Sequence, residues 1–237
     1  MKPKVKYFPC GDTALAVEFG DRIDRRLSAS VVGLGNRIDE VRLDGLVETV
    51  PTFRSLLVHY DPLKTSASRL ITQIDTLLEA GADEQSTGRL WRVPACYQGD
   101  LAPDLEEVAS RTGLTPSEVV AGHTVERYYV YMLGFLPGFP YMGDLPEPLQ
   151  LPRRENPRVK VPAGSVAIAL NMTAVYSFES PGGWHLIGRT PISLFSPGRT
   201  PPALVQPGDA VCFEAISRAE FDCLSNDAFV PVPEELA

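Results

Sequence analysis

Apolar and polar positions in the first part of the chain follow two periods, that of strands and that of helices. Apolar residues recur at helical spacing in 27–41 and again after Ser66, a residue type that favours a helix start. Gly81 suits the end of that second helix. Four short runs have the pattern of strands: 14–19, 46–50, 53–60 and 90–94. The order β-α-β-β-α-β predicts a ferredoxin-like α/β domain.

The polar stretch 81–88 contains few apolar residues, and we expect it to be the linker to a second domain. The expected domains are therefore 1–88 and 89–237. The second domain opens with two short helices. The first covers 105–113, and the second begins at Thr115, where the sequence Thr-Pro-Ser-Glu has the pattern of a capping box.

Helical periodicity then disappears, and short apolar runs alternate with turns of proline and glycine. Most of the 22 prolines lie in this second part. The runs that predict strands are 126–135, 158–161, 165–170, 174–178, 184–187, 192–195 and 210–214. Many short strands with regular turns predict a β-barrel or sandwich. The expected class is therefore α+β.

Composition narrows the possible functions. The chain has 237 residues and a formal net charge of −8, without a basic stripe, so nucleic acid is an unexpected partner. No apolar run is long enough to span a membrane, and the first residues lack the apolar core of a signal peptide, so we expect a cytoplasmic protein. The four cysteines and three histidines are scattered, and no metal site is expected.

Residues 134–146, GFLPGFPYMGDLP, combine prolines, glycines and aromatic side chains. Such a segment cannot form a helix or a regular strand, because proline lacks the amide donor. It would hold Phe135 and Tyr141 at fixed angles, which suits the wall of a substrate pocket. A rigid packed corner of the fold is the alternative.

Residues 153–165 hold a cluster of cations in an otherwise acidic protein. If 159–161 is a strand, Arg158 and Lys160 share one face and could bind a carboxylate or a phosphate. Ser165 would add a hydroxyl. The alternative is a solvated sheet edge that discourages strand addition.

Residues 180–191 contain the pair Gly182 and Gly183, which allows a tight turn or a close backbone contact with a ligand. His185 follows at the start of a strand and is a candidate general acid or base. Arg189 and Thr190 add a cation and a hydroxyl. A histidine with a purely structural role is the alternative.

Several motifs are absent. The sequence has no phosphate loop of the G-x-x-x-x-G-K-[ST] type, no G-x-G-x-x-G after a strand and no G-x-S-x-G elbow. The chain therefore does not have the sequence of a self-sufficient ATPase or serine hydrolase.

Three blocks of the sequence resemble the allophanate hydrolase subunit 1 family, which also includes the B-type subunit of 5-oxoprolinase and a bacterial inhibitor of a sporulation kinase. The blocks are GFLPGFPYMGDLP, PRRENPRVKVPAGSVAIA and SPGGWHLIGRTPISLF. Shorter similarities at GDTALAVEFG, VPTFRSLLVHYDP and CYQGDLAPDLEEVA extend the resemblance over nearly the whole chain.

This resemblance implies a small N-terminal α/β domain followed by a C-terminal cyclophilin-like β-barrel. It also implies a hydrolase subunit, acting on C–N bonds and inactive alone, that works with a second, C-type subunit of cyclophilin-like fold. Together with a lactam-utilisation subunit, such a complex opens 5-oxoproline to glutamate with ATP. In the urea-degrading relatives, the equivalent pair forms the carboxyl-transfer half of urea carboxylase.

On this basis Arg158, Lys160 and Arg189 would hold a carboxylate or a transferred carboxy or phospho group, and His185 would assist proton transfer. The alternative, from the kinase inhibitor, is a regulatory module that binds a sensor histidine kinase, with Phe135 among its contact residues.

The chain departs from the family at one position. The family has a Gly-Gly-x-Gln-Thr-Gly stretch followed by Tyr-Pro, whereas here Met172 stands in place of the glutamine. A thioether cannot replace the donors and the acceptor of an amide, so any ligand contact of that amide is lost or altered.

Overall fold

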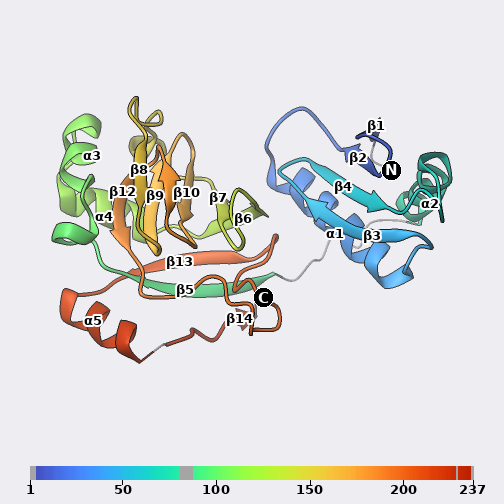
Figure 1. Cartoon of the computed structure of the whole chain (residues 1–237). Coiled ribbons are helices and arrows are strands. Elements are labelled where there is room, and N and C mark those ends of the chain that lie inside the picture. The colour runs from blue at the N-terminus through green and yellow to red at the C-terminus, as the bar shows by residue number, and fades with distance from the viewer. Residues whose placement is uncertain (1–3, 81–87, 228, 236–237) are drawn as a thin grey trace. The chain divides into compact units, whose positions relative to one another are not determined.

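The structure is a computed structural model that describes residues 4–80, 88–227 and 229–235. The chain consists of two compact units, residues 1–87 and 88–237 (Figure 1). Most of the expected linker, residues 81–87, and with it the expected helix end at Gly81, lies outside the described residues. No helix within the described ranges is long and apolar enough to cross a membrane.

The N-terminal unit is a four-stranded antiparallel sheet with two helices. The strand order is β1-β2-β4-β3. One hydrophobic core joins the two central strands to both helices. Ser66 caps the second helix as expected, because its hydroxyl accepts the Arg69 amide. The elements are β1 (Lys6–Pro9), β2 (Ala14–Glu18), α1 (Arg25–Val41), β3 (Leu46–Pro51), β4 (Ser55–Tyr60) and α2 (Ala67–Glu79).

The expected β-α-β-β-α-β order is wrong at both ends. The run at 90–94 is a strand, but it pairs within the C-terminal unit. The sheet position beside β2 is filled by β1, which the sequence pattern did not predict. The reason is that β1 has four mostly exposed residues and ends in Pro9, so no alternation is visible.

The C-terminal unit contains an eight-stranded mixed sheet in the order β12-β9-β10-β7-β6-β13-β5-β14, together with a two-stranded sheet of β8 and β11. Its strands are β5 (Arg89–Ala95), β6 (Tyr128–Leu133), β7 (Pro140–Gly143), β8 (Arg158–Val161), β9 (Ser165–Ala169), β10 (Met172–Val175), β11 (Ser180–Gly182), β12 (His185–Arg189), β13 (Ala210–Ala215) and β14 (Glu234–Glu235). Its helices are α3 (Leu105–Thr112), α4 (Pro116–Thr124) and α5 (Arg218–Asn226), with short 3-10 turns at Gly99–Leu101 and Glu147–Leu149.

The α+β class is confirmed, but the described strands do not form a closed barrel. Strand pairing leaves β12 and β14 as the edges of the large sheet. One isolated bridge joins Cys96, just beyond β5, to Arg189 at the end of β12, with N–O distances of 2.8 and 2.9 Å. At its other end, β5 pairs with β14 through Arg89 and Leu90.

Helices α3 and α4 pack against the large sheet and against each other. The capping box at Thr115 is confirmed, because its hydroxyl accepts the Glu118 amide and the Glu118 carboxylate accepts the Thr115 amide. The loop expected at 134–146 is wrong in part, because it contains β7, which begins at Pro140. The expected strand 192–195 is also wrong, because only one bridge, from Phe195 to Ala203, forms there.

Candidate functional site

A polar cavity of about 420 Å³ lies beside helix α3 and the segment that precedes β8. Its volume is in the range of small-molecule sites. It has charged groups of both signs on its wall: Glu107, Arg111, Pro152, Arg153, Arg154, Glu155 and Asn156.

The buried carboxylate of Asp104 stabilises this wall through hydrogen bonds. Its side chain is 3% exposed, and its Oδ1 accepts hydrogen bonds from Arg154, at 3.0 Å, and from Arg158. Its Oδ2 accepts the Leu186 amide at 2.7 Å, while the Asp104 amide donates to the Leu186 carbonyl at 3.0 Å. A buried carboxylate with three donors is firmly placed, so α3, β8 and β12 are fixed relative to each other.

The carboxylate of Glu107 lies on the cavity wall and is ionised at neutral pH. Its Oε2 accepts from Arg154 at 2.9 Å, and its Oε1 lies 3.5 Å from Arg111. The hydrogen bond from Arg154, and then the charge of that guanidinium, lower the pKa of Glu107 against the opposing effect of burial. Glu107 can therefore accept a hydrogen bond from a ligand N–H group.

His185 lies beneath the cavity and is fully buried. Its Nε2 is 2.9 Å from the carbonyl of Pro152, and a carbonyl can only accept, so Nε2 carries the proton. Nδ1 has no hydrogen-bond partner among the described residues. It lies 4.0 Å from Glu107 Oε1.

Arg153 is the cation on the cavity wall that has no acidic partner within the described ranges. Its guanidinium lies over the ring of Trp184, at 5.9 Å from the centroid. Trp184 contacts Tyr141, with centroids 6.1 Å apart, and Phe139, at 6.3 Å. Stacking on an aromatic ring orients a guanidinium and leaves its N–H groups free for a carboxylate.

The aromatic residues of 134–146 share one cluster around Phe139, which is buried. Phe135 contacts it at 5.4 Å but is 61% exposed, with a positive φ of 66°. Tyr141 contacts it at 5.0 Å, and burial raises the pKa of Tyr141. The structure thus places Tyr141 beside the Arg153 stack, and Phe135 at the surface.

The two predicted glycines differ in their constraints. A Cβ on Gly182 would lie 2.2 Å from the hydroxyl oxygen of Tyr176, so a side chain does not fit there. A Cβ on Gly183 would meet only ordinary contacts. The Gly183 carbonyl accepts the Arg154 amide at 2.8 Å and so fixes the cavity wall.

The remaining predicted residues lie elsewhere in the unit. Arg158 is bound to Asp104, and Lys160 is 70% exposed and paired with Glu179 at 3.0 Å. The Ser165 hydroxyl donates to the Pro162 carbonyl. Arg189 and Thr190 line a different cavity, of about 330 Å³. The predicted cations therefore do not converge on a single point.

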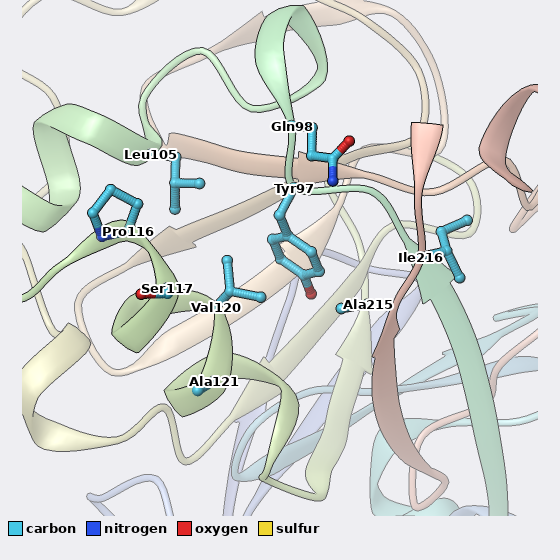
Figure 2. A pocket seen from close by; sticks show the side chains of 9 residues that line it. All are labelled: Tyr97, Gln98, Leu105, Pro116, Ser117, Val120, Ala121, Ala215 and Ile216. Carbon is cyan, nitrogen blue, oxygen red and sulfur yellow. The ribbon is translucent and has the colours of Figure 1, made fainter. Parts of the chain in front are cut away.

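A third cavity, of about 370 Å³, is largely apolar (Figure 2). Its wall includes the ring of Tyr97, whose hydroxyl lies 2.9 Å from Nδ1 of the fully buried His123. His123 Nε2 lies 2.9 Å from the Thr173 hydroxyl, which donates to the Ala167 carbonyl. Burial lowers the pKa of His123 to about 3, so the ring is neutral.

Sequence reasoning did not find Asp104 and Glu107, because both look like ordinary residues at the start of a helix. The structure shows that Asp104 precedes α3 without capping it. Its partners Arg154 and Arg158 lie about fifty residues away in sequence, and no local pattern connects them.

The chain is similar to several known proteins. The model of the family "carboxyltransferase domain, subdomain C and D" matches residues 5–205. The B-type subunit of the 5-oxoprolinase of Bacillus subtilis is 39% identical over 229 residues, which are 92% of this chain and 95% of that protein.

Two solved structures are similar as well. The protein TTHA0988 is 35% identical with a TM-score of 0.77, over 90% of this chain and 40% of that one. The urea amidolyase of Kluyveromyces lactis, 21% identical with a TM-score of 0.78 over 99% of this chain and 16% of that one, shows the fold alone. The resemblance stated from the sequence is confirmed.

Proposed function

Because this chain belongs to the family of carboxyltransferase domains, subdomains C and D, we propose that it is one subunit of a complex that opens a cyclic amide, as a 5-oxoprolinase does. The observation that carries this proposal is the 39% identity to the B-type subunit of a 5-oxoprolinase over nearly the full length of both chains. The proposed reaction is hydrolysis of the C–N bond of a lactam that bears a carboxylate.

We assign the substrate to the cavity beside α3. Arg153 holds the carboxylate of the lactam, since its guanidinium is oriented by Trp184 and has no acidic partner within the described ranges. Glu107 accepts the N–H of the lactam, since its carboxylate lies on the same wall and is ionised. Tyr141 contacts Trp184, the ring over which the Arg153 guanidinium lies.

Four further residues position Glu107. Asp104 binds Arg158 and Arg154, and Arg154 in turn binds Glu107. His185 lies behind Glu107, with its Nδ1 4.0 Å from Glu107 Oε1. In this proposal His185 and Arg158 act through Glu107 and not on the substrate directly.

ATP enters the proposal as a co-substrate of the assembled complex. The sequence has no glycine-rich phosphate loop, and the arginines Arg111 and Arg154 of the cavity are already paired with Glu107. We therefore assign the nucleotide to the complex with a C-type partner of cyclophilin-like fold and a lactam-utilisation subunit. TTHA0988, of which this chain spans 40%, supports a larger functional unit.

The experiment is co-expression with the genomic neighbours, purification of the complex and measurement of ATP-dependent conversion of 5-oxoproline to glutamate. Arg153→Gln should raise the KM for 5-oxoproline at least tenfold, because it removes the charge that holds the carboxylate. His185→Gln keeps a donor for Pro152 but lacks Nδ1, and should change the pH profile of kcat.

Lys64→Gln is the matched control, because Lys64 is an exposed cation of the N-terminal unit, paired with Asp61. It should leave both parameters unchanged. An assembled complex that turns over 5-oxoproline with an unaltered KM in Arg153→Gln contradicts the residue assignment. A complex without turnover contradicts the function itself. If the isolated chain then suppressed autophosphorylation of a sensor histidine kinase, the regulatory alternative, with Phe135 exposed for docking, would replace it.

A further inference from the structure

The cavity of about 330 Å³ at the other end of β12 is separate from the proposed lactam site, and the two share no lining residue. It lies where the end of β12, the turn before β9 and helix α5 meet. Its wall consists of Ala163, Gly164, Ser177, Arg189, Thr190, Pro191, Ile192, Ser193, Phe221 and Ser225.

Arg189 is a fixed cation on this wall. Its backbone forms the bridge to Cys96, and its Nε donates to the Ala163 carbonyl at 2.8 Å. Within the described ranges, no carboxylate lies within ion-pair distance of its guanidinium. The hydrogen bond from Arg218, at 2.6 Å, is the main cause of the lowered pKa of Asp100, and the charge of Arg189 adds only a minor contribution. The two terminal nitrogens of Arg189 can therefore bind an anion side by side.

Two hydroxyl groups on the same wall also lack acceptors in the part of the chain that is described. Thr190 is 3% exposed, and its Oγ accepts the Ile192 amide at 3.1 Å, so its own proton is free to donate. The Ser177 Oγ is shielded from water and has no partner. A buried hydroxyl without a partner costs about 1–3 kcal/mol, which a ligand acceptor would recover.

The turn that holds Arg189 in place requires glycine. Gly164 has a φ of +80°, and a Cβ there would lie 2.4 Å from the Thr190 carbonyl oxygen. The Gly164 carbonyl accepts the Thr190 amide at 2.9 Å. This close approach brings the Ala163 carbonyl to the guanidinium and sets its direction.

We propose that this cavity binds a small monocarboxylate with a short apolar chain. The carboxylate would accept two parallel N–H groups from Arg189, and the hydroxyl of Thr190 or Ser177 would donate to it. The apolar chain would lie against Ile192 and Phe221. A single guanidinium on a partly apolar wall suits one negative charge better than the two charges of phosphate.

The test is calorimetric titration of the isolated chain with propionate and butyrate. Since Arg153 could bind a carboxylate too, the titration is done in the Arg153→Gln variant, where that site is removed. We expect a Kd of about 1 mM, because these ligands have few atoms with which to make contacts. Butyrate should bind more strongly than propionate, because its apolar chain is longer. The double variant Arg153→Gln/Arg189→Gln should bind at least tenfold more weakly.

Inorganic phosphate is the competing ligand and should displace neither carboxylate. If tryptophan fluorescence shows that the double variant is misfolded, Arg153→Gln/Thr190→Val replaces it. This variant should lose carboxylate affinity by about threefold or more. Absence of carboxylate binding in the Arg153→Gln variant would overturn the proposal, as would equal binding in the double variant or stronger binding of phosphate. The titration needs no turnover, so its failure would not affect the proposed lactam reaction.

Discussion

Acidification should destabilise the C-terminal unit because His123 must remain neutral in the folded state. The ring is fully buried, and burial lowers its pKa to about 3. Tyr97 donates to Nδ1, and Nε2 donates to Thr173, so both ring nitrogens are already satisfied in the neutral form. A second ring proton would have to displace the hydroxyl proton of Tyr97, which has no other acceptor within the described ranges.

The magnitude follows from the difference between the folded and unfolded states. An unfolded histidine has a pKa of about 6.5, so between about pH 6.5 and pH 3 the unfolded chain binds a proton that the folded chain does not. A pKa that is lowered in the folded state means that the stability is present above the unfolded value and is lost as the pH falls. The free energy of unfolding should decrease by about 2 kcal/mol between pH 7 and pH 5.

The assay is urea unfolding at both pH values, followed by tryptophan fluorescence. Both tryptophans of the chain, Trp91 and Trp184, lie in the C-terminal unit, so the signal reports on that unit alone. The wild type is compared with His123→Gln, which cannot titrate. The variant is less stable at pH 7, but its free energy should change about 2 kcal/mol less than that of the wild type. An equal change in both proteins would refute the reasoning.

Three further predictions concern stability, each measured by urea unfolding. Leu170→Gly should stabilise the C-terminal unit by up to about 1 kcal/mol, because Leu170 is an exposed residue with a φ of 54°; a loss of stability would contradict this. Gly182→Ala should destabilise it by about 1–3 kcal/mol, because the new Cβ meets the Tyr176 hydroxyl; an unchanged midpoint would show that the ring moves freely. Asp104→Asn should cost about 3 kcal/mol, because Arg158 loses its buried counter-charge; a change below about 1 kcal/mol would show that water replaces the carboxylate.

Local signals predicted the elements of this fold well. Ser66 and Thr115 begin helices because their hydroxyls bind amides only three residues away, which a sequence reveals directly. The helix α5 carries the same signal, with Ser217 and Glu220 in a capping box, and sequence reasoning overlooked it. Pairing between strands was less predictable, because the register of 90–94 depends on partners far along the chain.

The candidate site was predictable only in part for the same reason. His185 stands out by its glycine-rich surroundings, and its segment does border the cavity. Glu107 carries no such mark, since a glutamate early in a helix is common. Its importance arises from Arg154, which reaches it across the fold. Lys160 is the opposite case. It stood out in sequence as part of a cluster of cations, but in the structure it forms an exposed ion pair with Glu179.

The parallel pairing of β5 with β13 has a consequence for synthesis on the ribosome. The strand β5 opens the C-terminal unit and β13 lies about 120 residues later, so the ladder between them cannot form until residues 210–215 have been made (Figure 1). The N-terminal sheet needs only strands within residues 6–60, so it can fold while translation continues. We infer that, during translation, the N-terminal unit is already folded while the strand β5 still lacks its partner β13. The unpaired strand β5 is then the segment most in need of a chaperone.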